Sequence, residues 1–98
     1  MGAKGYWVVG LDVEDAERYA TYSAFVRPFL AANGGRFVVA GGQQDVVEGM
    51  GRRRTVLVEF PSYADAVRVY RSDGYQKGMQ DRIAASVADF VIVEGLAE

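Results

Sequence analysis

The sequence contains no cysteine and no histidine among its 98 residues. The absence of cysteine excludes disulfide bonds, thiol nucleophiles and zinc sites built from thiolates. The absence of histidine removes the most common general base and the most common metal ligand in proteins. Any chemistry must therefore rely on arginine, tyrosine and carboxylate side chains, and we predict no metal and no cofactor.

The sequence also lacks an excess of positive charge and any long apolar run. Eleven basic and thirteen acidic residues give a net charge of −2, which argues against nucleic acid as a partner. No segment approaches the roughly 18 consecutive apolar residues that a membrane span needs. Half of the residues are hydrophobic, too many for a disordered chain. We therefore expect one domain over residues 1–98, cytoplasmic because no targeting signal is recognisable.

Apolar periodicity predicts four strands and two helical regions. The strands are expected at 6–11, 36–40, 55–60 and 89–94; the helical regions are expected at 15–32 and at 63–83, the second broken at 72–74. After the second strand, Gly41 and Gly42 interrupt the pattern, and residues 45–48 are expected to resume an extended conformation. In the last helical region, Tyr75, Met79 and Ile83 form a stripe at a spacing of four.

The resulting order of elements is βαββαβ. Two split βαβ halves of this kind predict an α+β fold, the ferredoxin-like plait, with a four-stranded antiparallel sheet and its helices on one face. The second face should then alternate to polar residues if it met water. Instead, both sets of alternating positions are apolar: Trp7 and Val9 oppose Val8, and Val58 opposes Leu57.

A bare apolar face of this size exceeds what a monomer usually exposes. We therefore predict a homodimer that packs the open sheet faces together across a two-fold axis. The alternative is a monomer whose second face is covered by the chain's tail and by the glycine-containing loop.

Several segments occur in an order that resembles a known family. They include the strand at 5–9, Gly34-Gly35-Arg36-Phe37 with the following Val38-Val39-Ala40-Gly41-Gly42, the stretch Val56-Leu57-Val58-Glu59-Phe60-Pro61-Ser62, and residues 70–82. Together they resemble domain of unknown function 1330, a bacterial family of the dimeric α/β-barrel superfamily. The resemblance covers nearly the whole chain and implies a ferredoxin-like protomer and a two-fold dimer. It implies no activity.

Polar side chains on otherwise apolar elements are the candidate ligand-binding residues. Arg36 and Glu59 lie on strands, Tyr22 and Tyr75 lie on helical stripes, and Arg82 lies at the edge of a stripe. A structural ion pair and hydrogen-bonded core tyrosines would explain them without a function. The functional interpretation is a cleft between sheet and helices, in which an arginine holds a carboxylate or enolate and a tyrosine donates a hydrogen bond. The basic run at 52–54 is interpreted as a solvated turn.

Three functions remain open from the sequence. The first is a small soluble homodimer that binds a small anionic or aromatic ligand. The alternative is a cofactor-independent monooxygenase or isomerase for a small phenolic or enolisable substrate, by analogy with other branches of the superfamily. In that case Glu59 would act as the base if burial raised its pKa, and Trp7 would face the substrate. Without an enzymatic role, Trp7 would fill the core or the dimer interface. A purely structural or regulatory role is the third.

Overall fold

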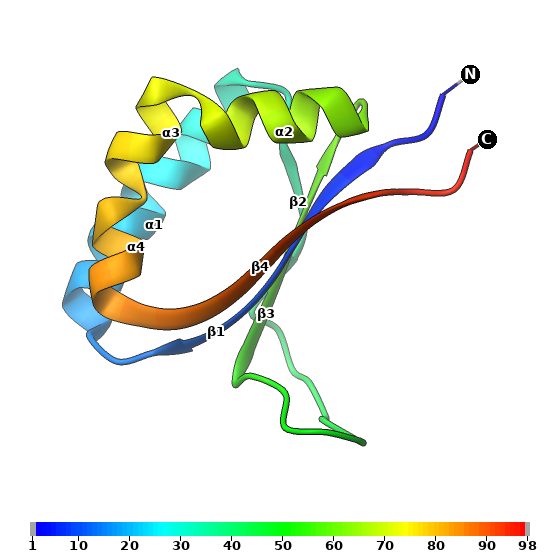
Figure 1. Ribbon diagram of the computed structural model, residues 1–98. Coiled ribbons are helices and arrows are strands. Elements are labelled where there is room, and N and C mark those ends of the chain that lie inside the picture. Colours follow the sequence, from blue (N-terminus) through cyan, green and yellow to red (C-terminus); the bar gives the residue numbers. More distant parts are fainter. Residues whose placement is uncertain (1, 98) are drawn as a thin grey trace.

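The computed structural model describes residues 2–97 and contains four strands and four helices (Figure 1). The strands are β1 (Gly5–Val13), β2 (Arg36–Ala40), β3 (Arg54–Phe60) and β4 (Ser86–Glu94); the helices are α1 (Ala16–Ala32), α2 (Tyr63–Arg71), α3 (Asp73–Gly78) and α4 (Gln80–Ala85). The strands form one antiparallel sheet in the order β2-β3-β1-β4. All helices lie on one side of it (Figure 1). The predicted ferredoxin-like α+β fold is confirmed.

The core lies between the helices and one face of the sheet. Trp7, Val9 and Leu11 of β1 point into it, and each is at most 4% exposed. The indole N–H of Trp7 donates a hydrogen bond of 2.9 Å to the carbonyl of Ala66 on α2. This bond satisfies the single polar atom of the tryptophan, which would otherwise be costly to bury.

Local signals in the sequence explain where the helices begin and end. The Asp15 carboxylate accepts a hydrogen bond from the amide of Arg18 and caps α1, and the Ser62 hydroxyl does the same for the amide of Asp65 in α2. Such caps satisfy amides that the first helical turn leaves unpaired. Gly34 follows the C-terminal cap of α1 and has a φ of 84°, a left-handed conformation that favours glycine.

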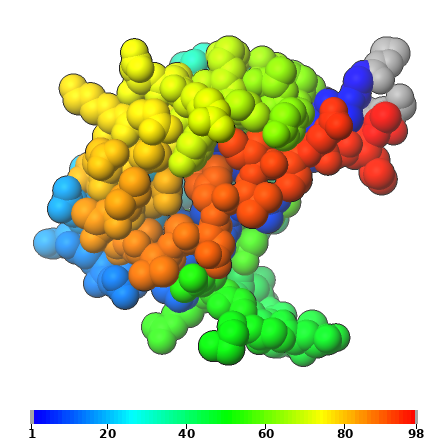
Figure 2. All heavy atoms as spheres, viewed as in Figure 1, coloured from blue at the N-terminus to red at the C-terminus, as the bar shows by residue number. Residues whose placement is uncertain are grey.

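Two expectations from the sequence are wrong. Residues 45–48 form no strand, because the whole segment 41–53 is a loop. We call this loop the arm; it projects from the sheet on the side away from the helices and stands out from the body of the molecule (Figures 1 and 2).

The second wrong expectation is the burial of Ile83 in the last helical region. Ile83 is 52% exposed, whereas its neighbour Arg82 is only 6% exposed. Tyr75, Met79 and Arg82 follow the helical repeat of 3.6 residues, and a constant spacing of four drifts off this face, so residue 82 is buried in place of residue 83.

The second face of the sheet is open to solvent. Val39, Leu57, Val8 and Val91 are paired in one row across all four strands, and Val91 is 51% exposed. The residues after β4 do not cover this row. They lie beside the N-terminal segment instead, where the Gly95 amide donates a hydrogen bond to the Lys4 carbonyl. No helix among residues 2–97 is both long enough and apolar enough to span a membrane.

Candidate functional site

A small cavity lies between α1 and the helix-covered face of the sheet. Its walls come from α1, α4 and all four strands, and its volume is about 30 Å³. By the same measure a water molecule needs roughly 10–15 Å³, so the cavity as it stands has room for about two waters. Most of the lining is apolar. The charged lining residues are Arg27, Arg54 and Arg82, and no carboxylate is among them.

Arg82 brings a buried positive charge to this cavity. Its guanidinium lies 5.1 Å from the ring centre of Phe90 and 5.8 Å from that of Tyr22. One terminal nitrogen lies 3.8 Å from the sulfur of Met79, a weak acceptor. The Nε atom is buried without a hydrogen-bond partner, and no carboxylate of the described residues is within ion-pair distance of the side chain. The charge is therefore stabilised by aromatic faces and by the neighbouring tyrosine hydroxyls, not by a carboxylate.

Two buried tyrosines lie next to this guanidinium. The hydroxyls of Tyr22 and Tyr75 are hydrogen-bonded at 2.7 Å. Burial raises the pKa of both tyrosines above 10.0, so both hydroxyls are protonated at neutral pH. Burial acts to lower the pKa of Arg82, but the oxygens of Tyr75 and Tyr22 act to raise it, and the net shift is upward. The cluster therefore offers a fixed cation and neutral hydroxyl donors.

Arg54 and Arg27 line the same cavity from its other side. The Arg54 guanidinium lies 5.5 Å from the ring centre of Tyr19 and donates a long hydrogen bond of 3.4 Å to the Ala40 carbonyl. A side chain at Gly41 would collide with this guanidinium. Arg27 is exposed and lies 5.3 Å from the ring centre of Phe37. Arg54 and Arg27 therefore form the more solvent-accessible end of the cavity.

The other two residues of the predicted set lie elsewhere. Arg36 and Glu59 are paired at 2.8 Å on the open face of the sheet, where the Tyr6 hydroxyl also donates to Glu59 at 3.0 Å. The Arg36 guanidinium and then the Tyr6 hydroxyl hold the pKa of Glu59 below its usual value. These two hydrogen bonds outweigh the opposing effect of burial on the pKa, and Glu59 is not among the residues that line the cavity.

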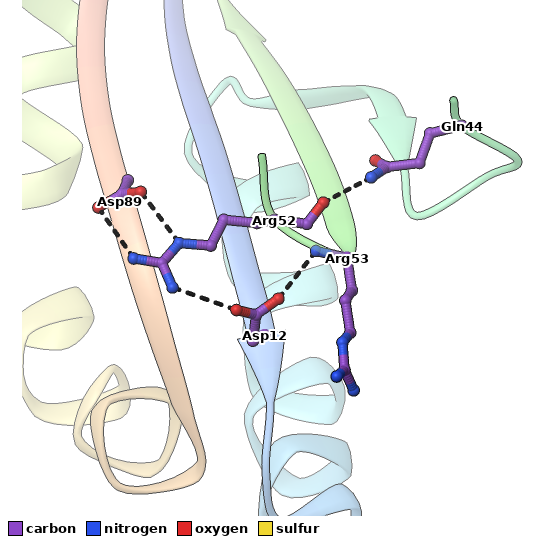
Figure 3. A network of polar contacts seen from close by, with 5 residues as sticks. All are labelled: Asp12, Gln44, Arg52, Arg53 and Asp89. Atoms are coloured by element: carbon purple, nitrogen blue, oxygen red, sulfur yellow. Dashed lines mark hydrogen bonds and ion pairs between the residues drawn. The ribbon is translucent and has the colours of Figure 1, made fainter. Parts of the chain in front are cut away.

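A second polar network lies on the open face near the arm (Figure 3). The Arg52 guanidinium is placed between Asp12 of β1, at 3.1 Å, and Asp89 of β4, at 3.0 Å. The amide of Arg53 donates to Asp12 at 2.8 Å. That hydrogen bond and the Arg52 charge hold the pKa of Asp12 below its ordinary value. This network ties the end of the arm to the sheet.

The structure thus brings together Tyr22, Tyr75 and Arg82 and separates them from Arg36 and Glu59. Arg54 was not predicted as a lining residue, because residues 52–54 were interpreted together as one solvated turn. Strand alternation contained the missing signal, since Arg54 shares the parity of Val56 and Val58, which face the core. Within residues 2–97, no group of three acidic side chains is placed to hold a metal ion.

Comparisons with known proteins place this fold among related structures. A protein of unknown function from Rhodopseudomonas palustris aligns with a TM-score of 0.77 at 20% identity, over 98% of this chain and 85% of that one. SnoaB, a cofactor-independent oxygenase from Streptomyces nogalater, aligns with a TM-score of 0.64 at 13% identity, over 93% and 91% of the two chains. At these identities the likeness shows the fold alone.

No curated protein matches the sequence. The model of the family described as "Domain of unknown function (DUF1330)" matches residues 4–96, and the chain therefore belongs to that family.

Proposed function

We propose that the protein is a cytoplasmic homodimer that binds a small anionic ligand with an apolar or aromatic body in the cavity between α1 and the sheet. The observation that carries this proposal is the Arg82 guanidinium, 6% exposed and without a carboxylate partner. A buried charge without a counter-ion is costly. A ligand carboxylate, phenolate or enolate would supply the missing charge and accept hydrogen bonds from Arg82 and the Tyr22 hydroxyl.

The cavity must open to admit such a ligand. Its volume of about 30 Å³ is far below the roughly 300–1,000 Å³ of pockets that hold small molecules. Arg27 and Arg54 are long side chains at its solvent-accessible end, and both rest on aromatic rings rather than on carboxylates. Arg27 is exposed, and a contact of this kind at an exposed site is worth only about 0.5–1 kcal/mol, so the displacement of Arg27 by a ligand is inexpensive.

Benzoate is the simplest probe of this proposal, and isothermal titration calorimetry measures its binding. Arg82→Met is expected to raise the Kd of benzoate at least tenfold, because charge-assisted hydrogen bonds contribute about 1.5–3 kcal/mol. Arg71→Met, at an exposed arginine on α2, is the control and should keep the wild-type Kd. The proposal fails if the wild type does not bind benzoate, or if Arg82→Met binds it as tightly as the wild type does.

The dimer part of the proposal rests on the open face. The apolar row through Val8 and Val91 is bounded at one end by the Arg36–Glu59 pair and at the other by the Arg52 network. Arg36 and Asp89 keep 69% and 70% of their side chains exposed. A two-fold axis through the apolar row brings the two rows together and leaves these opposite charges at the rim, the usual anatomy of an interface.

A cofactor-independent oxygenase or isomerase is the second candidate function. It is favoured by the placement of Arg82 beside the Tyr22 and Tyr75 hydroxyls, an arrangement able to stabilise an enolate. SnoaB, which shares the fold, is described as a cofactor-independent oxygenase. No carboxylate lines the cavity, so a substrate would have to ionise without a carboxylate base. Oxygen uptake with any compound found to bind tests this candidate, and binding without turnover counts against it.

A further inference from the structure

Two of the arginines that line the cavity have a buried nitrogen without a hydrogen-bond partner. Among residues 2–97, two buried side-chain nitrogens lack a hydrogen-bond partner, Nε of Arg54 and Nε of Arg82. Both arginines line the same cavity. Buried polar atoms are almost always paired in native proteins. Two unpaired guanidinium nitrogens around one cavity therefore indicate that both arginines await the same partner.

The two guanidinium groups flank a shared aromatic wall. Arg54 lies against the ring of Tyr19 at 5.5 Å, and Arg82 lies against the ring of Tyr22 at 5.8 Å. The centres of these two rings are 5.7 Å apart, because the tyrosines are three residues apart on α1. A ligand lying along these two rings would therefore meet one guanidinium beside each ring.

We infer that the ligand is a dianion with a compact aromatic or apolar body, of the aromatic dicarboxylate class. This inference rests on the proposed anion site at Arg82 and adds a second site at Arg54. Arg82 binds the first acidic group inside the cavity. Arg54 binds the second near solvent, and the exposed Arg27 lies on the same side. The lining contains three cations and no carboxylate, so a second negative charge meets attraction and no repulsion.

A structural role of Arg54 would predict a different response. Its hydrogen bond to the Ala40 carbonyl and its packing against Gly41 lie where the arm leaves β2. If Arg54 served only to hold this corner, its removal would lower stability but would not distinguish ligands with one acidic group from those with two. The comparison of two such ligands in the same variant therefore separates the roles.

The test compares benzoate with isophthalate, which adds one carboxylate to the same ring, by isothermal titration calorimetry. In the wild type, isophthalate is expected to bind at least tenfold more tightly than benzoate, the effect of one further charge-assisted contact. In Arg54→Met the ratio of the benzoate Kd to the isophthalate Kd should fall to about threefold or less. Arg53→Met is the matched control, because that side chain points away from the Arg52 network in Figure 3 and is absent from the cavity lining.

Each outcome decides one question. If neither compound binds, the proposed anion site itself fails. If both bind with equal Kd in the wild type, or if Arg54→Met keeps the full ratio, the dianion inference fails and the site at Arg82 stands. If Arg54→Met does not fold, added salt in the wild type must weaken isophthalate binding more than benzoate binding. An equal salt dependence overturns the inference.

Discussion

At the scale of single residues, the burial of the Arg82 guanidinium lowers the stability of the fold. Its guanidinium is buried among aromatic rings and a methionine sulfur, where an apolar side chain of similar length would avoid the desolvation penalty. Arg82→Met is therefore expected to melt at or above the wild-type temperature while losing benzoate binding. Such a gain in stability at the expense of binding is common when a functional group is removed.

The tyrosine pair sets the response of the protein to alkaline pH. Tyr22 and Tyr75 are 6% and 0% exposed, and burial raises the pKa of each above the unfolded value of 10.0. Because the raised pKa favours the protonated form, the stability from these hydroxyls is complete below pH 10 and is lost as the pH rises further.

We expect Tyr22 and Tyr75 to ionise only as the protein unfolds. Ultraviolet absorbance of tyrosinate and far-ultraviolet circular dichroism, followed together above pH 10, check this expectation. The tyrosinate absorbance of the double variant Tyr22→Phe/Tyr75→Phe is subtracted from that of the wild type. The difference, which reports Tyr22 and Tyr75, should rise at the pH at which the wild type loses its helical dichroism. Ionisation of these two tyrosines in a protein that keeps its native dichroism would contradict the packing described above.

At the scale of elements, two glycines allow α3 to pack closely on α1. An added Cβ at Gly74 would lie 3.0 Å from the ring of Phe29, and one at Gly78 would overlap the ring of Phe25. These two rings stack on each other at 5.1 Å, and the ring of Tyr75 packs beside both. The glycines thus help to bury Tyr75, and through it they position its partner Tyr22.

Gly78→Ala is expected to destabilise the protein although alanine is the better helix former. Helix propensity favours alanine by about 1 kcal/mol, but overpacking against Phe25 costs typically 1–3 kcal/mol or more. A net loss of about 1 kcal/mol would lower the Tm by roughly 4–8 °C. Thermal unfolding followed by circular dichroism measures the change.

Gly42→Ala serves as the control for this substitution, because nothing lies within 4 Å of the added Cβ. Its free energy of unfolding should stay within about 0.5 kcal/mol of the wild-type value. A Gly78→Ala protein that melts at or above the wild-type temperature would show that Phe25 moves aside freely.

At the scale of the whole molecule, the sheet is a layer covered on one side only. Helices bury the face with Trp7, while Val87, Val91 and Val93 on the other face remain 38–51% exposed. The arm extends on the same side as this open face (Figure 1). An open hollow of about 540 Å³, bordered by Met50 and Arg52 of the arm and by Asp12 and Asp89 of the sheet, adjoins the face. A second copy of the chain is the partner that we propose for this surface.

We expect light scattering to give a mass of about 21 kDa for the wild type, twice the 10.7 kDa of one chain. Val91→Asp should shift the mass toward 10.7 kDa, because an unpaired carboxylate in an apolar interface is costly to desolvate. Ile83→Asp is a closely matched control, since Ile83 is 52% exposed and Val91 51%, but Ile83 lies on α4. A monomeric wild type, or a Val91→Asp protein that remains dimeric, contradicts the proposal.

The sequence alone determined the order of the elements and the apolar character of both sheet faces. These properties follow from short-range periodicity, in which residues two, three or four positions apart share a face. Helix caps at Asp15 and Ser62 and the glycine at position 34 were predictable for the same reason, since each depends on neighbours within a few residues.

Only the tertiary structure decided which residues share the cavity. Because both faces of the sheet are apolar, alternation could not tell which face the helices cover, and Glu59 was grouped with the cavity residues although it lies on the open face. The packing of the last helices buried Arg82 next to Met79 and Tyr75 and left Ile83 exposed. The meeting of Arg54 with Arg82 around one cavity depends on packing between elements far apart in the sequence, and local periodicity does not encode such contacts.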